Sequence, residues 1–400
     1  MKITMDEERS CYERTLNDVK TVITHAKLQE CDLRPVSQNI YFGNHFEDYR
    51  LLELNKPILE GLTVGDRVVF RGSADDKAVL CTDTQTFELK DAETSNSMLL
   101  LPGLRWPEDM TSGSDEDRLL EKRQIIGIHH SYLEIRVCKP RLKKLRHILE
   151  GSAYRGSELE NDILESNVKF FTSEDLESIQ ASKEELKAAL EQIDAACLNG
   201  YWRILEFDYH YRILTLFLDL INSNSWSIDS IPVKETYDDL KDLVPELILK
   251  HLVRIYSEPS EKSQDGSVVK LKTAKVCRFL AEALLRSLKQ FNLKDFLKAW
   301  QDSVPEGLSV DIKQLEGLAL IDYESKPQTI SLYPESDLPE DIQERIEVLF
   351  SVREKWTFDQ IKPYVEPLAT AQMNVNALLT KYARAFFVKN VKHYCARHKK

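Results

Sequence analysis

Positive side chains near the carboxyl-terminal end are the residues whose type and spacing could do chemistry. No acidic residue follows Glu366 in this 400-residue chain, whereas cations cluster in the same stretch. They are Lys381, Arg384, Lys389, Lys392, Arg397, Lys399 and Lys400. Clustered cations without neighbouring carboxylates attract nucleic-acid phosphates. The segment therefore predicts DNA binding. The alternative interpretation is a solvated helix face and chain end that serve nuclear import.

An apolar stripe predicts a helix beneath these cations. Asn374 is a suitable N-cap, and apolar residues follow it at helical spacing, namely Val375, Leu378, Leu379, Tyr382 and Phe386. On such a helix Lys381 and Arg384 lie opposite the stripe, and Lys392 joins them if the helix continues. We expect this to be the recognition helix of a DNA-binding unit.

A second basic run occupies residues 139–146. It also contains no acid, and its cations are Lys139, Arg141, Lys143, Lys144 and Arg146. Pro140 and the apolar stripe over residues 142–149 fit equally well the polar face of a helix that covers neighbouring strands. The net charge of the whole chain is −12, which argues against a protein that coats nucleic acid with its entire surface.

Signatures of catalysis and cofactor binding are missing from the sequence. None of the patterns G-x-x-x-x-G-K-[ST], G-x-G-x-x-G, H-E-x-x-H or G-x-S-x-G occurs. The seven cysteines are far apart and include no C-x-x-C pair, so neither a disulfide framework nor a zinc site is indicated. We therefore predict no enzyme activity, no catalytic residues, no cofactor and no metal site.

The composition is typical of a globular protein, with 42% hydrophobic and 30% charged residues. No stretch reaches the roughly 18 apolar residues of a membrane span, and the charged start lacks the apolar core of a signal peptide. We expect an intracellular protein with no membrane partner. The length would hold two or three domains.

The first third of the chain predicts β-structure. Short apolar runs separated by turn residues cover 66–72, 77–81, 85–90 and 98–101, and a longer run covers 124–137. They predict a small barrel or half-sandwich over residues 45–138, with open edges for another chain to complete. We expect Val68, Phe70, Val79 and Phe87 to belong to this partner-shared region. Residues 1–44 give no comparable signal.

From Pro140 onward a helical pattern repeats four times. In each copy an aromatic residue precedes an N-cap residue, and an apolar residue follows five positions after the aromatic one. The copies are Phe171-Thr172 with Leu176, Trp226-Ser227 with Ile231, Phe291-Asn292 with Phe296, and Trp356-Thr357 with Ile361. Each predicts a hydrophobic staple at the start of a helix. The spacings between copies are 55, 65 and 65 residues.

A second helix and a hairpin are expected after the staples. The first copy continues with a helix over 182–199 and a strand over 201–207, and the third with a short helix and strands over 318–322 and 329–333. This order is that of a winged helix. Leading helices are expected over 209–222, 272–290 and 339–352. Pro232 makes the second copy irregular, because proline distorts a helix interior.

These patterns together predict the α+β class, with a small β-barrel-like domain followed by tandem winged-helix domains. The predicted divisions are 1–44 (poorly defined segment), 45–138 (β domain), 139–170 (helix and linker), 171–225 (winged helix), 226–290 (irregular unit), 291–355 (winged helix) and 356–400 (winged helix with a basic end).

Several longer motifs carry a family resemblance that spans residues 45–395. They are Tyr201-Trp202-Arg203-Ile204-Leu205-Glu206-Phe207-Asp208-Tyr209, Ser303-Val304-Pro305-Glu306-Gly307, Leu315 with Gly317-Leu318-Ala319-Leu320, Arg353-Glu354-Lys355-Trp356, Leu378-Leu379-Thr380-Lys381-Tyr382, Ala78-Val79-Leu80-Cys81, Thr94-Ser95-Asn96, and Pro140-Arg141-Leu142-Lys143-Lys144-Leu145. In this order they resemble the family of the defective in sister chromatid cohesion protein one.

The resemblance implies a nuclear, non-catalytic subunit of the cohesion-type replication factor C clamp loader. It implies that the β domain joins the carboxyl-terminal tail of the large subunit and a small chromosome transmission fidelity subunit in a composite barrel. It further implies that winged helices contact single- or double-stranded DNA and the catalytic subunit of DNA polymerase epsilon. The sliding clamp PCNA would be an indirect partner.

A different class of protein also fits the residues. A winged-helix transcription regulator with a β dimerisation domain would have the same order of elements. Such a regulator should purify alone as a dimer with sequence preference, whereas an adaptor with an unfinished barrel should aggregate without its partners.

Overall fold

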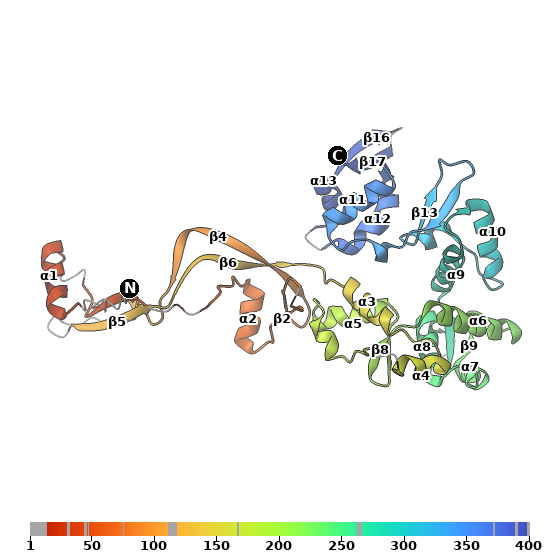
Figure 1. Ribbon diagram of the computed structural model, residues 1–400, viewed down its shortest axis with the longest axis horizontal. Helices are drawn as coiled ribbons and strands as arrows, with labels where there is room; N and C mark the ends of the chain where they lie inside the picture. The colour runs from red at the N-terminus through yellow and green to blue at the C-terminus, as the bar shows by residue number, and fades with distance from the viewer. Residues whose placement is uncertain are drawn as a thin grey trace, which may run out of the picture. The chain divides into compact units, whose positions relative to one another are not determined.

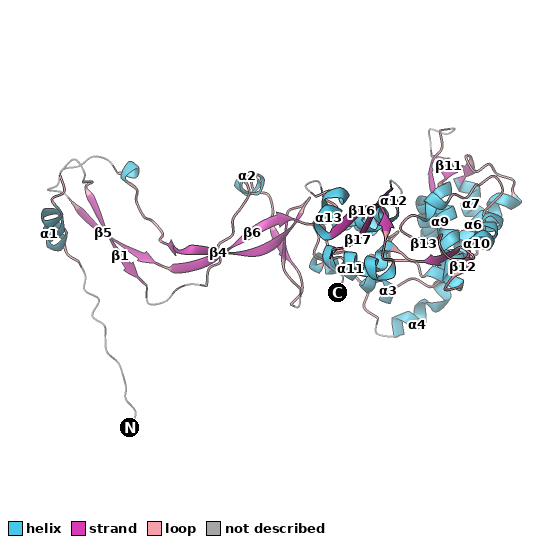
Figure 2. Cartoon of the chain, turned by 90° about the horizontal axis from the view of Figure 1, so that it is seen from above, coloured by secondary structure: helices cyan, strands magenta, loops and turns pink. Residues whose placement is uncertain are grey.

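The chain forms two compact units of mixed α and β structure. The computed structural model describes residues 14–29, 33–43, 46, 48–74, 76–110, 118–165, 168–261, 266–370, 373–388 and 391–397. The first unit comprises Met1–Thr63 and Leu89–Arg136, and the second comprises Val64–Glu88 and Val137–Lys400 (Figure 1). Most of the helices belong to the second unit (Figure 2).

Long strands with little cover dominate the first unit. Its elements are α1 (Leu16–Ala26), β1 (Val36–Phe42), most of α2 (Lys56–Val64), most of β4 (Thr86–Leu100), the 3-10 helix η2 (Pro107–Asp109), β5 (Leu119–Ile125) and most of β6 (Gly127–Val137). Strands β1 and β5 pair in parallel from Val36 and Leu119 to Phe42 and Ile125. Helix α1 buries none of its side chains.

Extended structure is present in the predicted β region, but the described strands do not close into a barrel. Strands β2 (Val69–Arg71) and β3 (Val79–Cys81) join β4 and β6 in an open sheet of order β2-β3-β4-β6. The separate strands expected over 85–90 and 98–101 are wrong, because both belong to β4. The polar residues between them suggested a turn. Pairing with β6 instead keeps them extended, with many of their side chains exposed.

Four repeats with one order of elements make up the rest of the second unit. Each repeat has a leading helix, a short extended segment, a second helix, a third helix and a hairpin. The first repeat contains α3 (Lys143–Gly151), η4 (Ser157–Leu159), α4 (Glu160–Glu165), η5 (Asp175–Ser178), α5 (Lys183–Gln192), β7 (Ala196–Leu198) and β8 (Tyr201–Arg203). The second contains α6 (Phe207–Ser223), β9 (Ile231–Pro232), α7 (Val233–Leu240), α8 (Glu246–Tyr256), β10 (Ser257–Pro259) and β11 (Val268–Leu271).

The third and fourth repeats follow the same order. The third contains α9 (Thr273–Ser287), β12 (Phe291–Asn292), α10 (Leu293–Ser303), η6 (Ile312–Leu315), β13 (Ala319–Asp322) and β14 (Thr329–Leu332). The fourth contains η7 (Glu335–Asp337), α11 (Ile342–Val352), β15 (Trp356–Thr357), α12 (Phe358–Val365), η8 (Glu366–Leu368), α13 (Val375–Tyr382), β16 (Ala383–Val388) and β17 (Val391–Ala396). The three leading helices expected before the later copies are confirmed.

Strand order is the same in the repeats. The short strand before the second helix pairs with the last strand of the hairpin, which gives the orders β9-β11-β10, β12-β14-β13 and β15-β17-β16. In the first repeat a single bridge joins Phe171 to Trp202 on β8. The aromatic residue that precedes three of the helices therefore also joins the repeat's small sheet.

Two of the four predicted N-caps, Asn292 and Thr357, are confirmed, whereas Thr172 makes the same kind of hydrogen bond in the turn before η5, whose N-cap is Glu174. Oxygen atoms of the Thr172, Asn292 and Thr357 side chains accept hydrogen bonds from the backbone N–H groups of Asp175, Lys294 and Gln360 at 3.2, 2.9 and 3.4 Å. The cap at Ser227 is wrong, because α7 begins after Pro232 and Ile231 lies in β9. The fixed φ of proline suits a helix start, so the second repeat has the regular order.

A hairpin turn at an Asn-Gly pair lies where the sequence predicted the end of a helix. Helix α5 ends at Gln192 rather than at residue 199, and β7 follows. Asn199 and Gly200 have φ values of 52° and 88° and form the two-residue turn between β7 and β8. Positive φ at both positions is the requirement of a tight hairpin turn, which explains this pair of residues.

Three clusters of buried hydrophobic residues form the cores of the repeats. The second and third repeats share one continuous cluster, to which Tyr154, Ala196 and Leu198 of the first repeat also belong, while the rest of the first repeat and the fourth repeat each form a cluster of their own. In the fourth repeat Trp356 is fully buried, and its Nε1 donates to the carbonyls of Leu349 and Arg353 at 3.1 and 2.8 Å. Its leading helix, its hairpin and the helices between them thus contribute to a single core.

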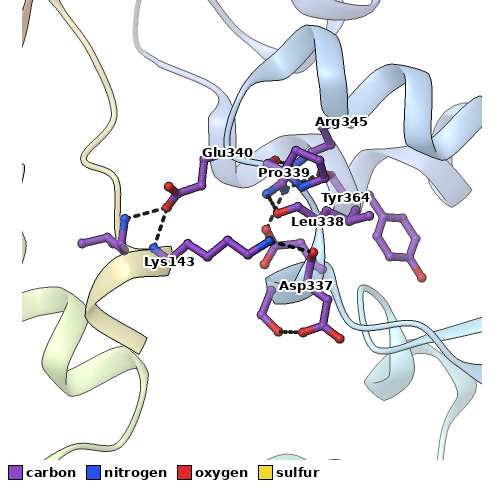
Figure 3. A network of polar contacts seen from close by, with 10 residues as sticks. Lys143, Asp337, Leu338, Pro339, Glu340, Arg345 and Tyr364 are labelled. Atoms are coloured by element: carbon purple, nitrogen blue, oxygen red, sulfur yellow. Dashed lines mark hydrogen bonds and ion pairs between the residues drawn. The ribbon is translucent and has the colours of Figure 1, made fainter. Parts of the chain in front are cut away.

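A carboxylate fixes the fourth repeat to the start of α3 (Figure 3). Glu340 Oε1 accepts hydrogen bonds from the backbone N–H groups of Leu142 and Lys143 at 2.6 and 2.7 Å. Lys143 Nζ donates to the Asp337 carbonyl at 3.1 Å. Buried Arg345 donates to Glu335 at 2.6 Å and to the Tyr364 carbonyl at 2.9 Å. These contacts position the fourth repeat within the second unit.

Acid is expected to destabilise the second repeat through His210. Burial, reinforced by the charges of His251 and Lys275, lowers the pKa of His210 from 6.5 to about 3. The folded protein therefore favours neutral His210, and this stabilisation is complete above pH 6.5 and decreases as the pH falls towards 3. Urea unfolding should show a loss of about 2 kcal/mol between pH 7 and 5 that His210→Gln lacks. Parallel pH profiles of the two proteins would contradict this expectation.

Candidate nucleic-acid interface

The basic segment of the fourth repeat is a short helix followed by a hairpin. Helix α13 ends at Tyr382, and residues 383–388 form β16. The predicted helix through Phe386 is therefore wrong. Ala383 is buried and pairs with Ala396 on β17, so the chain becomes extended at this point. Of the predicted helical cations, only Lys381 lies on the helix, and Arg384 and Lys392 lie on the hairpin.

The described cations are all exposed, but they do not form one row. Lys381 lies in the last turn of α13, Arg384 lies on β16, Lys392 lies on β17, and Arg397 follows β17. The predicted residues Lys389, Lys399 and Lys400 lie outside the described residues. A guanidinium nitrogen of Arg397 donates to the Lys381 carbonyl at 2.6 Å, which brings these two residues together at the base of the hairpin.

Strand register places Arg384 and Lys392 on opposite faces of the hairpin. Arg384 is opposite Cys395, whereas Lys392 is opposite Phe387. Successive side chains of a strand alternate between its faces, so Arg384 shares a face with Phe386, and Lys392 shares the other with Phe387. The expectation that Lys381, Arg384 and Lys392 lie on one polar side of a helix is therefore wrong.

Carboxylates do not neutralise this segment. No described acid forms an ion pair with Lys381, Arg384, Lys392 or Arg397. Lys381 Nζ and Lys392 Nζ instead lie over the rings of Tyr382 and Tyr394, at 5.0 and 5.1 Å from the ring centroids. Exposed cations beside aromatic rings retain their positive charge for a polyanion.

One side of the third helix in each of the first two repeats packs against other parts of the chain. At the start of α5, the backbone N–H of Ser182 donates to Thr86 Oγ1 at 2.8 Å, and Thr86 Oγ1 donates to Glu185 at 2.6 Å. Seven of the eleven residues of α8 are buried, and its His251 ring lies 2.8 Å from the Asp194 carbonyl. Their opposite sides are exposed but carry carboxylates, at Glu184 and Glu191 of α5 and at Glu246 of α8.

The third and fourth repeats also differ in the length and exposure of their third helix. In the third repeat, η6 is one 3-10 turn of four residues, and Arg278 donates to the carbonyls of Gln314 and Glu316 at 2.7 and 2.8 Å. Helix α13 instead exposes Asn376, Thr380 and Lys381. Among the α-helices in this position, α5, α8 and α13, α13 is the one whose exposed residues include a cation and no carboxylate.

Internal contacts use part of the second basic run. Lys144 Nζ forms an ion pair with Asp76 at 2.6 Å, and Lys143 is part of the contact with the fourth repeat. Leu145 and Leu149 are fully buried in the core of the first repeat. Of the two interpretations left open by the sequence, these contacts favour the polar face of a packed helix.

The predicted partner-binding residues have different surroundings. Val79 and Phe87 are buried, at 4% and 2% exposure, whereas Phe70 is 57% exposed on the edge strand β2. Val68 is half-buried and precedes this strand. Phe70 is opposite Leu80, and Leu80 is opposite Phe87, so this row of side chains leads from a buried core to an exposed edge.

The first unit exposes many large apolar side chains. Ile40, Phe42 and Leu119 belong to the parallel pair β1–β5 and are 52%, 65% and 60% exposed. Trp106 is 62% exposed. A two-stranded sheet without cover is marginally stable in water. The sequence indicated an incomplete β region but not β1, although the segment VSQNIYF contains β-branched and aromatic residues that could have identified it.

The described part of the chain contains no candidate metal site and no candidate membrane span. Its residues include no cluster of three His, Cys, Asp or Glu side chains placed to hold a metal ion. None of its helices combines the length and apolar composition that crossing a membrane requires.

Comparison with known proteins identifies the family. Residues 49–365 match the family model described as sister chromatid cohesion protein Dcc1. The chain is 39% identical over 386 residues to sister chromatid cohesion protein DCC1 of Danio rerio, covering 96% of this chain and 98% of the relative. It is 37% identical over 391 residues to the protein of the same name from Homo sapiens, covering 96% and 99%.

A more distant relative carries the same protein name. Sister chromatid cohesion protein DCC1 of Saccharomyces cerevisiae is 22% identical over 381 residues, covering 87% of this chain and 97% of the relative. These names are those of cohesion proteins and describe no enzyme activity. The match to the family model and the near-complete coverage of relatives above 30% identity lead to one conclusion: the chain belongs to the Dcc1 family of sister chromatid cohesion proteins.

Proposed function

We propose that the chain is a non-catalytic adaptor subunit of the cohesion-type replication factor C clamp loader. In this proposal the β region joins the carboxyl-terminal tail of the large subunit and a small chromosome transmission fidelity subunit. The repeats hold the assembly on DNA and on the catalytic subunit of DNA polymerase epsilon, near the sliding clamp PCNA. Such a subunit supports clamp loading and sister chromatid cohesion, and it is located in the nucleus.

The order of elements supports a winged-helix interpretation of the repeats. A leading helix, a short strand, two helices and a hairpin with the short strand beside its last strand are the elements of a winged helix. We propose that each unit begins at its leading helix, which gives divisions at 143–203, 207–271, 273–332 and 342–396. The single core of the fourth repeat supports this division, because α11 and β17 both contribute to it.

The contrast among the third helices carries the DNA-binding part of the proposal. Helices α5 and α8 expose carboxylates beside their cations, η6 is one turn, and α13 combines an exposed face free of carboxylates with the cations of the hairpin. We therefore assign DNA contact to the fourth repeat. The other repeats have scaffold and partner-binding roles in this proposal, because exposed carboxylates on α5 and α8 repel a phosphate backbone and η6 is too short to fill a groove.

Exposed apolar residues at open sheet edges support partner binding. Unpaired edges and uncovered strands favour aggregation unless another chain covers them. Phe70 is the partner-binding candidate that the structure leaves exposed, and Val79 and Phe87 support it from within the core. The partner would therefore contact Phe70 directly and Val79 and Phe87 only through the sheet.

Substitution of Phe70 tests the adaptor proposal. Phe70→Asp should abolish co-purification with the large-subunit tail and the small subunit in co-expression, because a charge replaces an apolar contact at the edge strand. Leu243→Asp, at a residue that is 65% exposed between α7 and α8, is the matched control and should co-purify normally. Circular dichroism should show that both variants are folded. Retention of both partners by folded Phe70→Asp would refute the assignment of this edge.

A further inference from the structure

The hairpin of the fourth repeat exposes an unusually large aromatic surface near its tip. Phe387 is 71% exposed, which exceeds the 65% of Phe42 and the 62% of Trp106. Val388 and Val391 are 40% and 49% exposed. Phe387 belongs to none of the chain's buried clusters, so packing within the described chain does not account for it.

Cations accompany the aromatic rings on both faces of this hairpin. Phe387 is directly opposite Lys392 on one face. On the other face the rings of Phe386 and His393 stack with centroids 5.7 Å apart and an angle of 30° between their planes, and Arg384 lies on the same face. The hairpin therefore combines flat apolar surfaces with positive charge at spacings of one or two residues.

We propose that Phe387 is a stacking platform for an unpaired base, and that Lys392 contacts the phosphate beside it. Single-strand-binding proteins combine cations that follow the backbone with aromatic side chains on which bases stack. Within a duplex each base is already stacked on its neighbours, so Phe387 meets exposed base faces only on a single strand or at a junction. The proposal rests on DNA binding by the fourth repeat and adds a preference for unpaired DNA.

The third repeat shows why an exposed aromatic residue alone does not make such a site. Tyr323 is 51% exposed beyond β13, where Asp322 and Glu324 flank it. Carboxylates repel a phosphate backbone, so this hairpin lacks the electrostatic attraction that brings a strand to the ring. Tyr323 is therefore a matched control for Phe387.

Fluorescence anisotropy with the full chain, co-purified with the partners of its β region, tests the proposal. The labelled probes are a mixed-sequence single strand, the blunt duplex of that sequence, and a single strand of the same length in which alternate positions lack a base. The unaltered chain should bind the intact strand about tenfold more tightly than the abasic strand, because stacking requires bases. Phe387→Ala should bind the intact strand about tenfold more weakly than the unaltered chain does, with little change on the duplex or the abasic strand.

Two further variants complete the experiment. Phe387→Trp should retain the preference for the intact strand, because a larger ring also stacks, and Tyr323→Ala should behave like the unaltered chain. Equal affinity of the unaltered chain for intact and abasic strands would overturn the stacking proposal alone. An equal loss on all three probes for Phe387→Ala, or no loss, would also overturn it. Absence of binding to every probe would refute DNA binding by the fourth repeat, and stacking with it.

Discussion

The combined variant Lys381→Glu, Arg384→Glu and Lys392→Glu is expected to bind DNA about a hundredfold more weakly than the unaltered chain at physiological salt. Each lost phosphate contact removes the release of about one counterion, so the slope of log affinity against log salt should decrease by about 2 to 3. The loss should be similar on unrelated sequences, because phosphate contacts carry no base information. Titrations of the full chain at several salt concentrations provide the measurement.

Single reversals test the geometry of the hairpin. Arg384 and Lys392 lie on opposite faces, so a DNA that contacts one face responds to one reversal, whereas a DNA that encloses the hairpin responds to both. Lys294→Glu on α10 makes the same charge change at an exposed position of the third repeat and should leave the slope unchanged. An unchanged slope in the combined variant would show that these cations do not contact DNA.

Removal of the Trp356 side chain is expected to destabilise the fourth repeat by about 3 to 5 kcal/mol. Trp356 is fully buried, its backbone pairs with Tyr394 on β17, and its ring lies 5.7 Å from that of Tyr364. The fourth repeat has its own buried cluster, so Trp356→Ala should unfold this repeat at a lower urea concentration than the rest of the chain. Hydrogen exchange along a urea series can separate the two transitions.

Trp106→Ala is the control for this substitution. Trp106 is 62% exposed in the first unit, so its removal should change the free energy of unfolding by less than about 0.5 kcal/mol. Trp356→Ala should also lose the affinity for DNA that depends on α13 and its hairpin. A variant whose repeats all unfold together would show instead that the fourth repeat has no stability of its own.

Local sequence signals predicted the repeats well. Aromatic residues before Thr172, Asn292 and Thr357 marked the second helices, because capping depends on residues within one turn of the helix start. The leading helices expected over 209–222, 272–290 and 339–352 are present as α6, α9 and α11. Pro232 was misleading, because a residue that distorts a helix interior is well tolerated at a helix start, and β9 ends at this residue.

Features set by distant pairing were not predicted from the sequence. The polar residues 91–97 suggested a turn, but pairing with β6 makes them part of β4. The stripe from Val375 through Phe386 fitted a helix, but pairing of residues 383–388 with β17 ended it at Tyr382. The strand β1 depends on β5, which lies some eighty residues further along the chain. For β4 and β1 a distant strand determines the conformation, whereas for residues 383–388 a hairpin with the next strand competes with the helix.

The sequence predicted which segment contains the candidate site but not how its side chains are arranged. The run of cations after Glu366 identified the segment, whereas its division between a helix and the two faces of a hairpin required the strand register. Which side of α5 and of α8 is exposed was also not predicted from the sequence, because it depends on contacts such as those of Thr86 with α5 and of Asp194 with α8. The exposed carboxylates of α5 and α8, which α13 lacks, distinguish the first two repeats from the fourth.

Hydrogen exchange of the full chain with and without DNA tests the central assignment most directly. The assignment predicts that DNA slows exchange in residues 373–388 and 391–397, while α5, α8 and η6 exchange at unchanged rates. The chain should be measured in complex with the partners of its β region. These partners cover the exposed apolar residues, so the chain stays in solution. Protection of α5, α8 or the hairpin of the third repeat, without protection in the fourth repeat, would contradict the assignment.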